Sequence, residues 1–387
     1  MKYRISRSRF DGMKDKKLPS DIGLVTRAKL ELAYFSGYAM AMRSCGGAGV
    51  VLRFARVRPR HAGRFQPLRG DEITPQFLDR AIHALKRWKL DIVSMDEVCR
   101  RAVTLAAPRR FVCLTFDGGY KDVASFAYPV LSRHDVPFTV YVPTAFPDGV
   151  GEAWWLALEA VIAREHRLSL VMDREERHFN IASAAEKSEL YDFLARWMRS
   201  LPPSDLSLAI NDLCSRYSLD LAALSHAASM DWHDLAKLAA DQRVTIGAAT
   251  VNYPVLSNLT DATALREITM GATVIETALS RKIRHFAYPF GDAASWQRKH
   301  AVMAAETGFA SAVSSVPGVV QNAGQSDLHA LPRISWDGRL QSLRALRVML
   351  SGSLLAHPPV PINKADIANG ARSEASFGME ARKAVLD

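Results

Sequence analysis

Residues 111–119 read Phe-Val-Cys-Leu-Thr-Phe-Asp-Gly-Gly, an apolar run that ends in an aspartate and two glycines. A near-continuous apolar run is typical of a parallel strand that is buried on both faces of a sheet. The glycines predict a turn, after which we expect a helix over residues 122–133 and a strand over 138–142. Asp117 should therefore lie at the carboxyl edge of a parallel sheet, where α/β proteins place their chemistry. A carboxylate there either acts as a general base or caps the turn.

The same alternation of strands and helices occurs in the last third of the chain. Strands are expected at 243–247, 284–288 and 309–313, and helices at 261–279, 294–306 and 341–350. Such alternation predicts a parallel sheet with helices on its faces, either an α/β barrel or an open doubly wound sheet.

The segment before residue 111 continues this pattern. We expect a helix over residues 26–43 and a strand over 50–54. A second helix should begin at Thr74-Pro75, with threonine as N-cap and proline in the first helical position. Ser94 and Glu97 have the spacing of a capping box, which predicts another helix there.

Composition limits the class of protein. Of the 387 residues, 48% are hydrophobic and 23% are charged, which excludes disordered and fibrous classes. The net charge of +10 suits an acidic partner. The four cysteines have no CxxC spacing, so a disulfide framework or a zinc site of cysteine pairs is not expected.

No apolar run reaches the ~18 residues of a membrane span, and no apolar segment directly follows the basic N-terminus. We therefore expect a cytoplasmic protein with neither transmembrane segment nor signal peptide.

Three short motifs carry a more specific signal. They read Thr-Phe-Asp-Gly-Gly-Tyr at 115–120, Ile-Gly-Ala-Ala-Thr-Val-Asn-Tyr-Pro at 246–254 and Phe-Ala-Tyr-Pro-Phe-Gly at 286–291. In this order they resemble the motifs of the polysaccharide deacetylase family, also called the chitooligosaccharide deacetylase homology domain. Gly-Phe-Ala at 308–310 and Leu-Pro-Arg-Ile at 331–334 also resemble the end of that domain. The resemblance extends over about residues 50–350.

This resemblance implies a fold and an activity. The family fold is a distorted (β/α) barrel, and the family removes acetyl groups from N-acetylated sugars. A divalent metal, usually zinc, is held by the second Asp of motif one and by two His of motif two. The metal polarises the amide carbonyl and activates the attacking water, while the first Asp takes its proton. The expected substrate or ligand is thus an N-acetylated oligo- or polysaccharide.

The domain organisation follows from the composition and the predicted elements, and the resemblance names the barrel. We expect a basic flexible arm, two parts of a deacetylase-like barrel with a helical insertion between them, and a flexible tail. The arm covers residues 1–25, the two barrel parts cover 26–149 and 236–352, the insertion covers 150–235, and the tail covers 353–387.

The metal-binding positions of the family are changed in this sequence. Gly118 stands at the position of the metal-binding Asp, and Ala249 and Tyr253 stand at the two His positions. The first Asp is retained as Asp117, whereas the arginine of motif three aligns with Ala287. Glycine and alanine offer no donor atom, and a phenol with a pKa near ~10 is a poor replacement for imidazole. We therefore expect no metal cofactor and no zinc-dependent mechanism, as in a pseudoenzyme.

A different metal site or an aromatic cleft would give other functions. Asp117, Asp122, His134, His285 and Asp292 are the nearest alternative metal ligands, although His134 reads as a helix-end cap and His285 as a core residue. An Asp117–Asp292 pair at the barrel mouth is a further alternative to Asp292 as a turn former. The expected sugar-binding residues are aromatic: Trp154, Trp155, Tyr253, Tyr288 and Phe290. The two tryptophans could instead fasten the insertion to the barrel.

The loop from Arg53 to Arg69 contains six arginines and could bind an anionic partner or simply face solvent. No nucleic-acid-binding motif accompanies it. Three functions stay open from sequence: a glycan-binding relative of the deacetylases without their zinc mechanism, an active carbohydrate amide hydrolase that uses Asp117 with a relocated metal or none, and a basic scaffold for an acidic partner.

Overall fold

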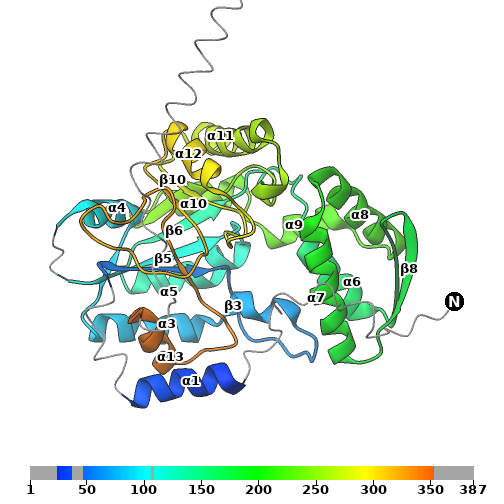
Figure 1. Ribbon diagram of the computed structural model, residues 1–387, viewed down its shortest axis with the longest axis horizontal. Helices are drawn as coiled ribbons and strands as arrows, with labels where there is room; N and C mark the ends of the chain where they lie inside the picture. Colours follow the sequence, from blue (N-terminus) through cyan, green and yellow to red (C-terminus); the bar gives the residue numbers. More distant parts are fainter. Residues whose placement is uncertain (1–23, 37–46, 106–108, 353–387) are drawn as a thin grey trace, which may run out of the picture.

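The central element is a curled parallel sheet with helices on its outer face (Figure 1). The computed structural model describes residues 24–36, 47–105 and 109–352. Within them, the sheet has the strand order β11-β10-β9-β6-β5-β1-β12, and β4 also pairs with β5. The strands are β1 (Gly49–Phe54), β4 (Asp91–Val93), β5 (Phe111–Asp117), β6 (Phe138–Val142), β9 (Val244–Ala248), β10 (His285–Ala287), β11 (Ser311–Val313) and β12 (Ile334–Ser335).

The sheet is the distorted barrel that the motifs predicted. All its strand pairs are parallel, so the carboxyl ends of β5, β6, β9 and β10 lie at one edge. β5 is buried over its whole length, as its apolar run requires. The helices around the barrel are α1 (Leu24–Phe35), α3 (Pro75–Arg87), α4 (Met95–Val103), α5 (Tyr128–Arg133), α10 (Trp232–Ala239), α11 (Asp261–Leu279), α12 (Arg298–Glu306) and α13 (Leu343–Leu350).

Helix boundaries follow local capping. Thr74 accepts a hydrogen bond from the backbone of Phe77, so α3 begins at the predicted Thr-Pro pair. Ser94 caps α4 in the same way. The helix predicted over residues 294–306 begins only at Arg298, because Asp292 accepts hydrogen bonds from the backbone of Ala294 and the hydroxyl of Ser295 and forms a turn instead. The helix predicted over 122–133 starts with a π-helical turn over Val123–Ala127.

Residues 154–228 form a lobe beside the barrel (Figure 1). It contains α6 (Trp154–Arg164), α7 (Ala184–Ser200), α8 (Pro203–Arg216) and α9 (Leu221–Ala228), and it has a hydrophobic core of its own. It also contains a hairpin that the helical prediction missed, β7 (Arg167–Met172) paired with β8 (Glu175–Asn180). The hairpin turn uses Asp173 and Arg174 at positive φ rather than glycine, so the usual hairpin signal is missing from the sequence.

Other elements are short. They are β2 (Arg56–Val57) paired with β3 (Glu72–Ile73), and the 3-10 turns η4 (Pro67–Asp71) and η6 (Leu256–Asn258). Among the described helices, none has the length and apolar composition to cross a membrane. The predicted tail, most of the predicted arm, and the end of the helix predicted over 26–43 lie outside the described residues.

Candidate functional site

A cleft of about 320 Å³ lies at the carboxyl edge of the sheet, beside Asp117. Its walls come from β1 and the residues after it, from the loop after β5, and from helices α6 and α7 of the lobe. Asp117 is the last residue of β5 and pairs in register with Tyr141 of β6. The prediction that Asp117 ends a buried strand at the carboxyl edge of the sheet is confirmed.

Asp117 is held by two arginines. The Nη1 and Nη2 atoms of Arg333 donate to its two carboxylate oxygens at 2.7 and 2.8 Å, and Nε of Arg53 donates to Oδ2 at 2.6 Å. Arg333 is fully buried and Asp117 is 2% exposed. Burial alone would raise the pKa of Asp117, but the two guanidinium charges outweigh it and hold the pKa below its ordinary value. Asp117 is therefore ionised at neutral pH and is a weak proton acceptor.

Neither arginine was expected beside Asp117 from the motifs. Arg53 lies in β1, where parallel pairing sets it beside Thr115 of β5. Arg333 precedes β12, and its Nε donates to the carbonyl of Ser314. The alignment of the family's motif-three arginine with Ala287 left Asp117 without a partner. In the sequence, Arg333 belongs to Leu-Pro-Arg-Ile at 331–334, one of the segments that resemble the family.

Gly118 follows Asp117 with a backbone that excludes most side chains. Its φ is +98°, a value that L-residues rarely adopt. A Cβ atom placed there would also lie 2.7 Å from the Tyr120 ring. Position 118 therefore cannot hold an aspartate in this conformation.

The other two family metal positions are occupied by groups that do not bind zinc well. Ala249 follows β9, is fully buried, and has no donor side chain. Tyr253 lies 8% exposed, with its ring 5.1 Å from that of Phe290 and 5.9 Å from that of Trp155. Burial raises the pKa of the Tyr253 phenol, so the phenolate that could bind a metal is disfavoured.

These residues do not fit the zinc ion that the family resemblance implies. A catalytic zinc site needs three protein ligands, and the three positions that align with the family's ligands hold Gly118, Ala249 and Tyr253. We therefore derive no catalytic step through a metal at this edge.

Aromatic side chains form much of the cleft wall. Trp154, Trp155, Tyr253 and Phe290, four of the five predicted aromatic residues, are brought together there. The indole nitrogen of Trp155 donates to the Tyr120 hydroxyl at 2.9 Å, which fixes the orientation of its half-buried ring. This ring also lies 6.3 Å from that of Phe290. Both tryptophans therefore join the lobe to the barrel and also face the cleft.

Tyr288, the fifth predicted aromatic residue, does not line the cleft. It is fully buried and stacks on Trp296 with ring centroids 4.4 Å apart. Its hydroxyl donates to the carbonyl of His329. Its position indicates packing rather than ligand binding.

The alternative metal ligands are dispersed. Asp122 accepts a hydrogen bond from Arg56 at 2.7 Å, and His285 contacts Ser311 inside the core. Asp292 forms an ion pair with Arg199 of α7, whose guanidinium lies over the Phe290 ring. The carboxylate of Asp117 is bound by arginines, not paired with Asp292.

His134, the remaining alternative ligand, lies at the C-cap of α5, as its reading as a helix-end residue predicted. Its Nε2 lies 2.9 Å from Oδ1 of Asp79 in α3. None of the residues in this contact lines the cleft.

The arginine loop is only partly a free basic surface. Arg53 and Arg56 turn inward to Asp117 and Asp122, and Arg58 pairs with Glu72 at 3.3 Å. The other three arginines of the loop are exposed: Arg60, Arg64 and Arg69.

Comparison with known proteins agrees with the fold and the motifs. Residues 216–312 match the family model described as polysaccharide deacetylase, a segment that includes β9 and β10 with the second and third motifs. The resemblance to the polysaccharide deacetylase family is confirmed. A comparison with curated proteins finds no match.

Solved structures of deacetylases share the fold of this deacetylase-like chain. The Streptococcus pyogenes deacetylase PplD, in complex with acetate, is 16% identical, with a TM-score of 0.51 over 78% of this chain and 97% of PplD. A de-N-acetylase from Aggregatibacter actinomycetemcomitans is 11% identical, with a TM-score of 0.50 over 78% of this chain and 99% of that protein.

Proposed function

We propose that this deacetylase-like protein binds N-acetylated glycans in the cleft beside Asp117 and does not use the zinc-dependent mechanism of its family. The observation that carries the proposal is the state of Asp117, which is ionised, buried and bound by Arg333 and Arg53. A carboxylate with a lowered pKa is a poor general base at neutral pH. Amide hydrolysis without an activated water would need far more than the ~10²–10⁴-fold that a general base supplies.

The walls of the cleft support glycan binding. Its volume of about 320 Å³ lies in the range of small-ligand sites. Sugar rings have apolar faces that pack on flat aromatic side chains, and Trp155 offers a ring whose orientation is fixed by Tyr120. Arg196 and Arg199 of α7 also line the cleft and add positive charge to its wall.

Binding and hydrolysis can be measured together. Titration calorimetry with N-acetylglucosamine oligomers should give measurable binding that glucosamine oligomers do not reproduce. Trp155→Ala should weaken binding roughly 2–10-fold, since stacking on an aromatic ring contributes about 0.5–1.5 kcal/mol. The matched control is Trp232→Ala, because Trp232 does not line the cleft. Equal affinity of the wild type and Trp155→Ala would contradict the proposed site.

An acetate-release assay tests the catalytic part of the proposal. We expect no release above background from the same oligomers. Release that a chelator abolishes would contradict the proposal. Release that resists chelation but is lost in Asp117→Asn would favour the alternative amide hydrolase. Binding of polyanions alone, sensitive to salt, would favour the scaffold through Arg60, Arg64 and Arg69.

The cytoplasmic location and the division of the chain at residues 25, 149, 235 and 352 stay predictions.

A further inference from the structure

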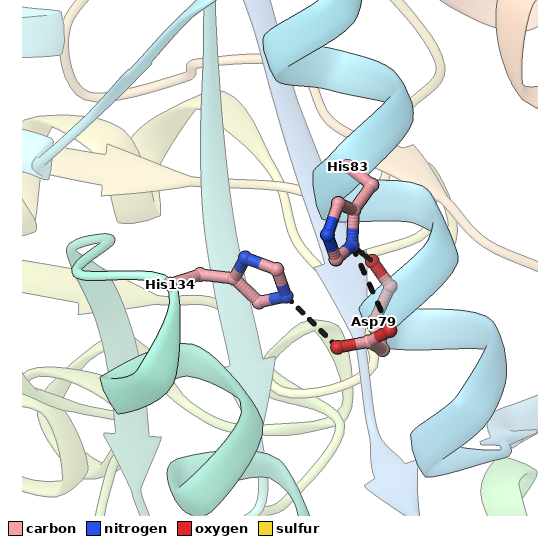
Figure 2. A group of neighbouring side chains, drawn as sticks. All are labelled: Asp79, His83 and His134. Carbon is pink, nitrogen blue, oxygen red and sulfur yellow. Dashed lines mark hydrogen bonds and ion pairs between the residues drawn. The ribbon is translucent and has the colours of Figure 1, made fainter.

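Two histidines and an aspartate meet on the helical layer, among residues that do not line the cleft (Figure 2). Asp79 and His83 are one turn apart on α3, and His134 caps the neighbouring helix α5. Figure 2 shows both rings turned toward the Asp79 carboxylate. Nε2 of His134 lies 2.9 Å from Oδ1, and Nδ1 of His83 lies 3.6 Å from Oδ2.

The donor set has the chemistry of a transition-metal site. One ligand atom from each of the three residues lies within 4.8 Å of the others. Imidazole nitrogen and carboxylate oxygen bind zinc at about 2.0–2.2 Å, so neighbouring ligands of a tetrahedral ion lie roughly 3.3 Å apart. Small side-chain movements would close the present spacing. We propose that Asp79, His83 and His134 bind a divalent transition-metal ion such as zinc, with water completing the coordination.

Burial differs among the three ligands in a way that favours assembly of the site. His134 is 9% exposed and fixed by the packing of α5 on α3, whereas the His83 side chain is 68% exposed and can rotate. The two rings already lie edge to face, with centroids 4.4 Å apart. A bound ion would replace the hydrogen bonds of His134 to the carboxylate and of His83 to the Asp79 carbonyl. It would thereby cross-link the two helices.

Two cations oppose the ion. Nη1 of Arg133 lies 3.6 Å from Oδ1 of Asp79, and the Lys86 ammonium donates to the carbonyl of His134. The expected affinity is therefore micromolar rather than the much tighter binding of closed structural zinc sites.

Zinc binding to the full, tag-free chain tests the proposal. At pH 7.5 we expect one Zn²⁺ per chain by calorimetry and a zinc-dependent rise in the thermal midpoint. His83→Ala and Asp79→Asn should each weaken binding at least ~10-fold. His233→Ala is the matched control, since His233 is an exposed histidine on α10. His83 is itself exposed, so its loss should leave the fold unchanged by circular dichroism.

Three results would overturn the inference: no saturable binding, binding that is unchanged in His83→Ala, or binding that is lost in an Asp117→Asn variant whose circular dichroism spectrum is that of the wild type. The last result would place the ion in the cleft, which would also contradict the proposed function. Failure of zinc binding at the cluster alone would leave glycan binding in the cleft unaffected.

Discussion

Asp117 in the cleft and Asp79 on α3 are two aspartates in ion pairs, and their partners give them different chemistry. Asp117 is buried and bound by two guanidinium groups, which have no lone pair to offer a ligand. Asp79 is 30% exposed and faces two imidazoles, whose ring nitrogens can act as metal ligands. The partners of a carboxylate therefore decide whether it is held in place or can take part in metal binding.

The largest expected effect tests how firmly Asp117 is held. Arg333→Met removes the buried partner and leaves a buried carboxylate with Arg53 alone. Removal of one member of a buried ion pair costs about 3–5 kcal/mol of unfolding free energy. Urea denaturation measures the change. Arg53→Met should cost less, because the Arg53 side chain is 16% exposed. A loss below ~1 kcal/mol for Arg333→Met would mean that the pair does not fix the carboxylate.

The second prediction concerns Gly118, which aligns with the metal-binding Asp of the family motif. Gly118→Ala should lower the unfolding free energy by about 1–3 kcal/mol, because φ is +98° and the new methyl group would meet the Tyr120 ring. Gly308→Ala is the matched control, since Gly308 has φ +91° and nothing within 4 Å of a Cβ. Gly308→Ala should lower the unfolding free energy less, because it has the strain of a positive φ but no contact between the new methyl group and a neighbour. Equal costs would show that an aspartate at position 118 is excluded by the backbone only.

A pH series sharpens the contrast between the two regions. The pKa of Asp117 lies below its ordinary value, so Asp117 stays ionised as the pH falls from 8 to 5.5, and glycan binding should hardly change. Metal binding generally releases protons from the ligands, so zinc affinity at the cluster should fall as the pH is lowered over the same range. Calorimetry at each pH measures both. Loss of glycan binding in parallel with zinc binding would mean that the cleft depends on the cluster.

The sequence predicted the barrel better than the cleft. Apolar runs such as Phe111–Phe116 and the Thr74-Pro75 cap are local signals, and the structure confirms both. The pairing of Arg333 with Asp117 spans 216 residues and follows from strand order, which no local pattern encodes. The β7–β8 hairpin was missed because its turn lacks glycine and β8 is largely polar.

The Asp79 cluster was only partly visible from the sequence. The positions of Asp79 and His83 suit one helix face, but His134 reaches them through the packing of α5 on α3. A histidine at a helix end reads as a cap by itself. The proposed role of His134 as a metal ligand depends on which helix packs beside α5, and that packing is a tertiary property.

The smallest expected effect is electrostatic and tests Asp79 as a ligand. Arg133→Gln removes a cation 3.6 Å from the Asp79 carboxylate, so zinc affinity should rise about 2–5-fold. The effect is modest because the Arg133 side chain is 67% exposed and solvent screens its charge. Arg64→Gln, which removes the same charge from the exposed loop, should leave the affinity unchanged. Added salt should shrink the difference between the two variants, because screening weakens the opposing charge. An unchanged or lower affinity in Arg133→Gln would argue that the ion, if bound, does not contact this carboxylate.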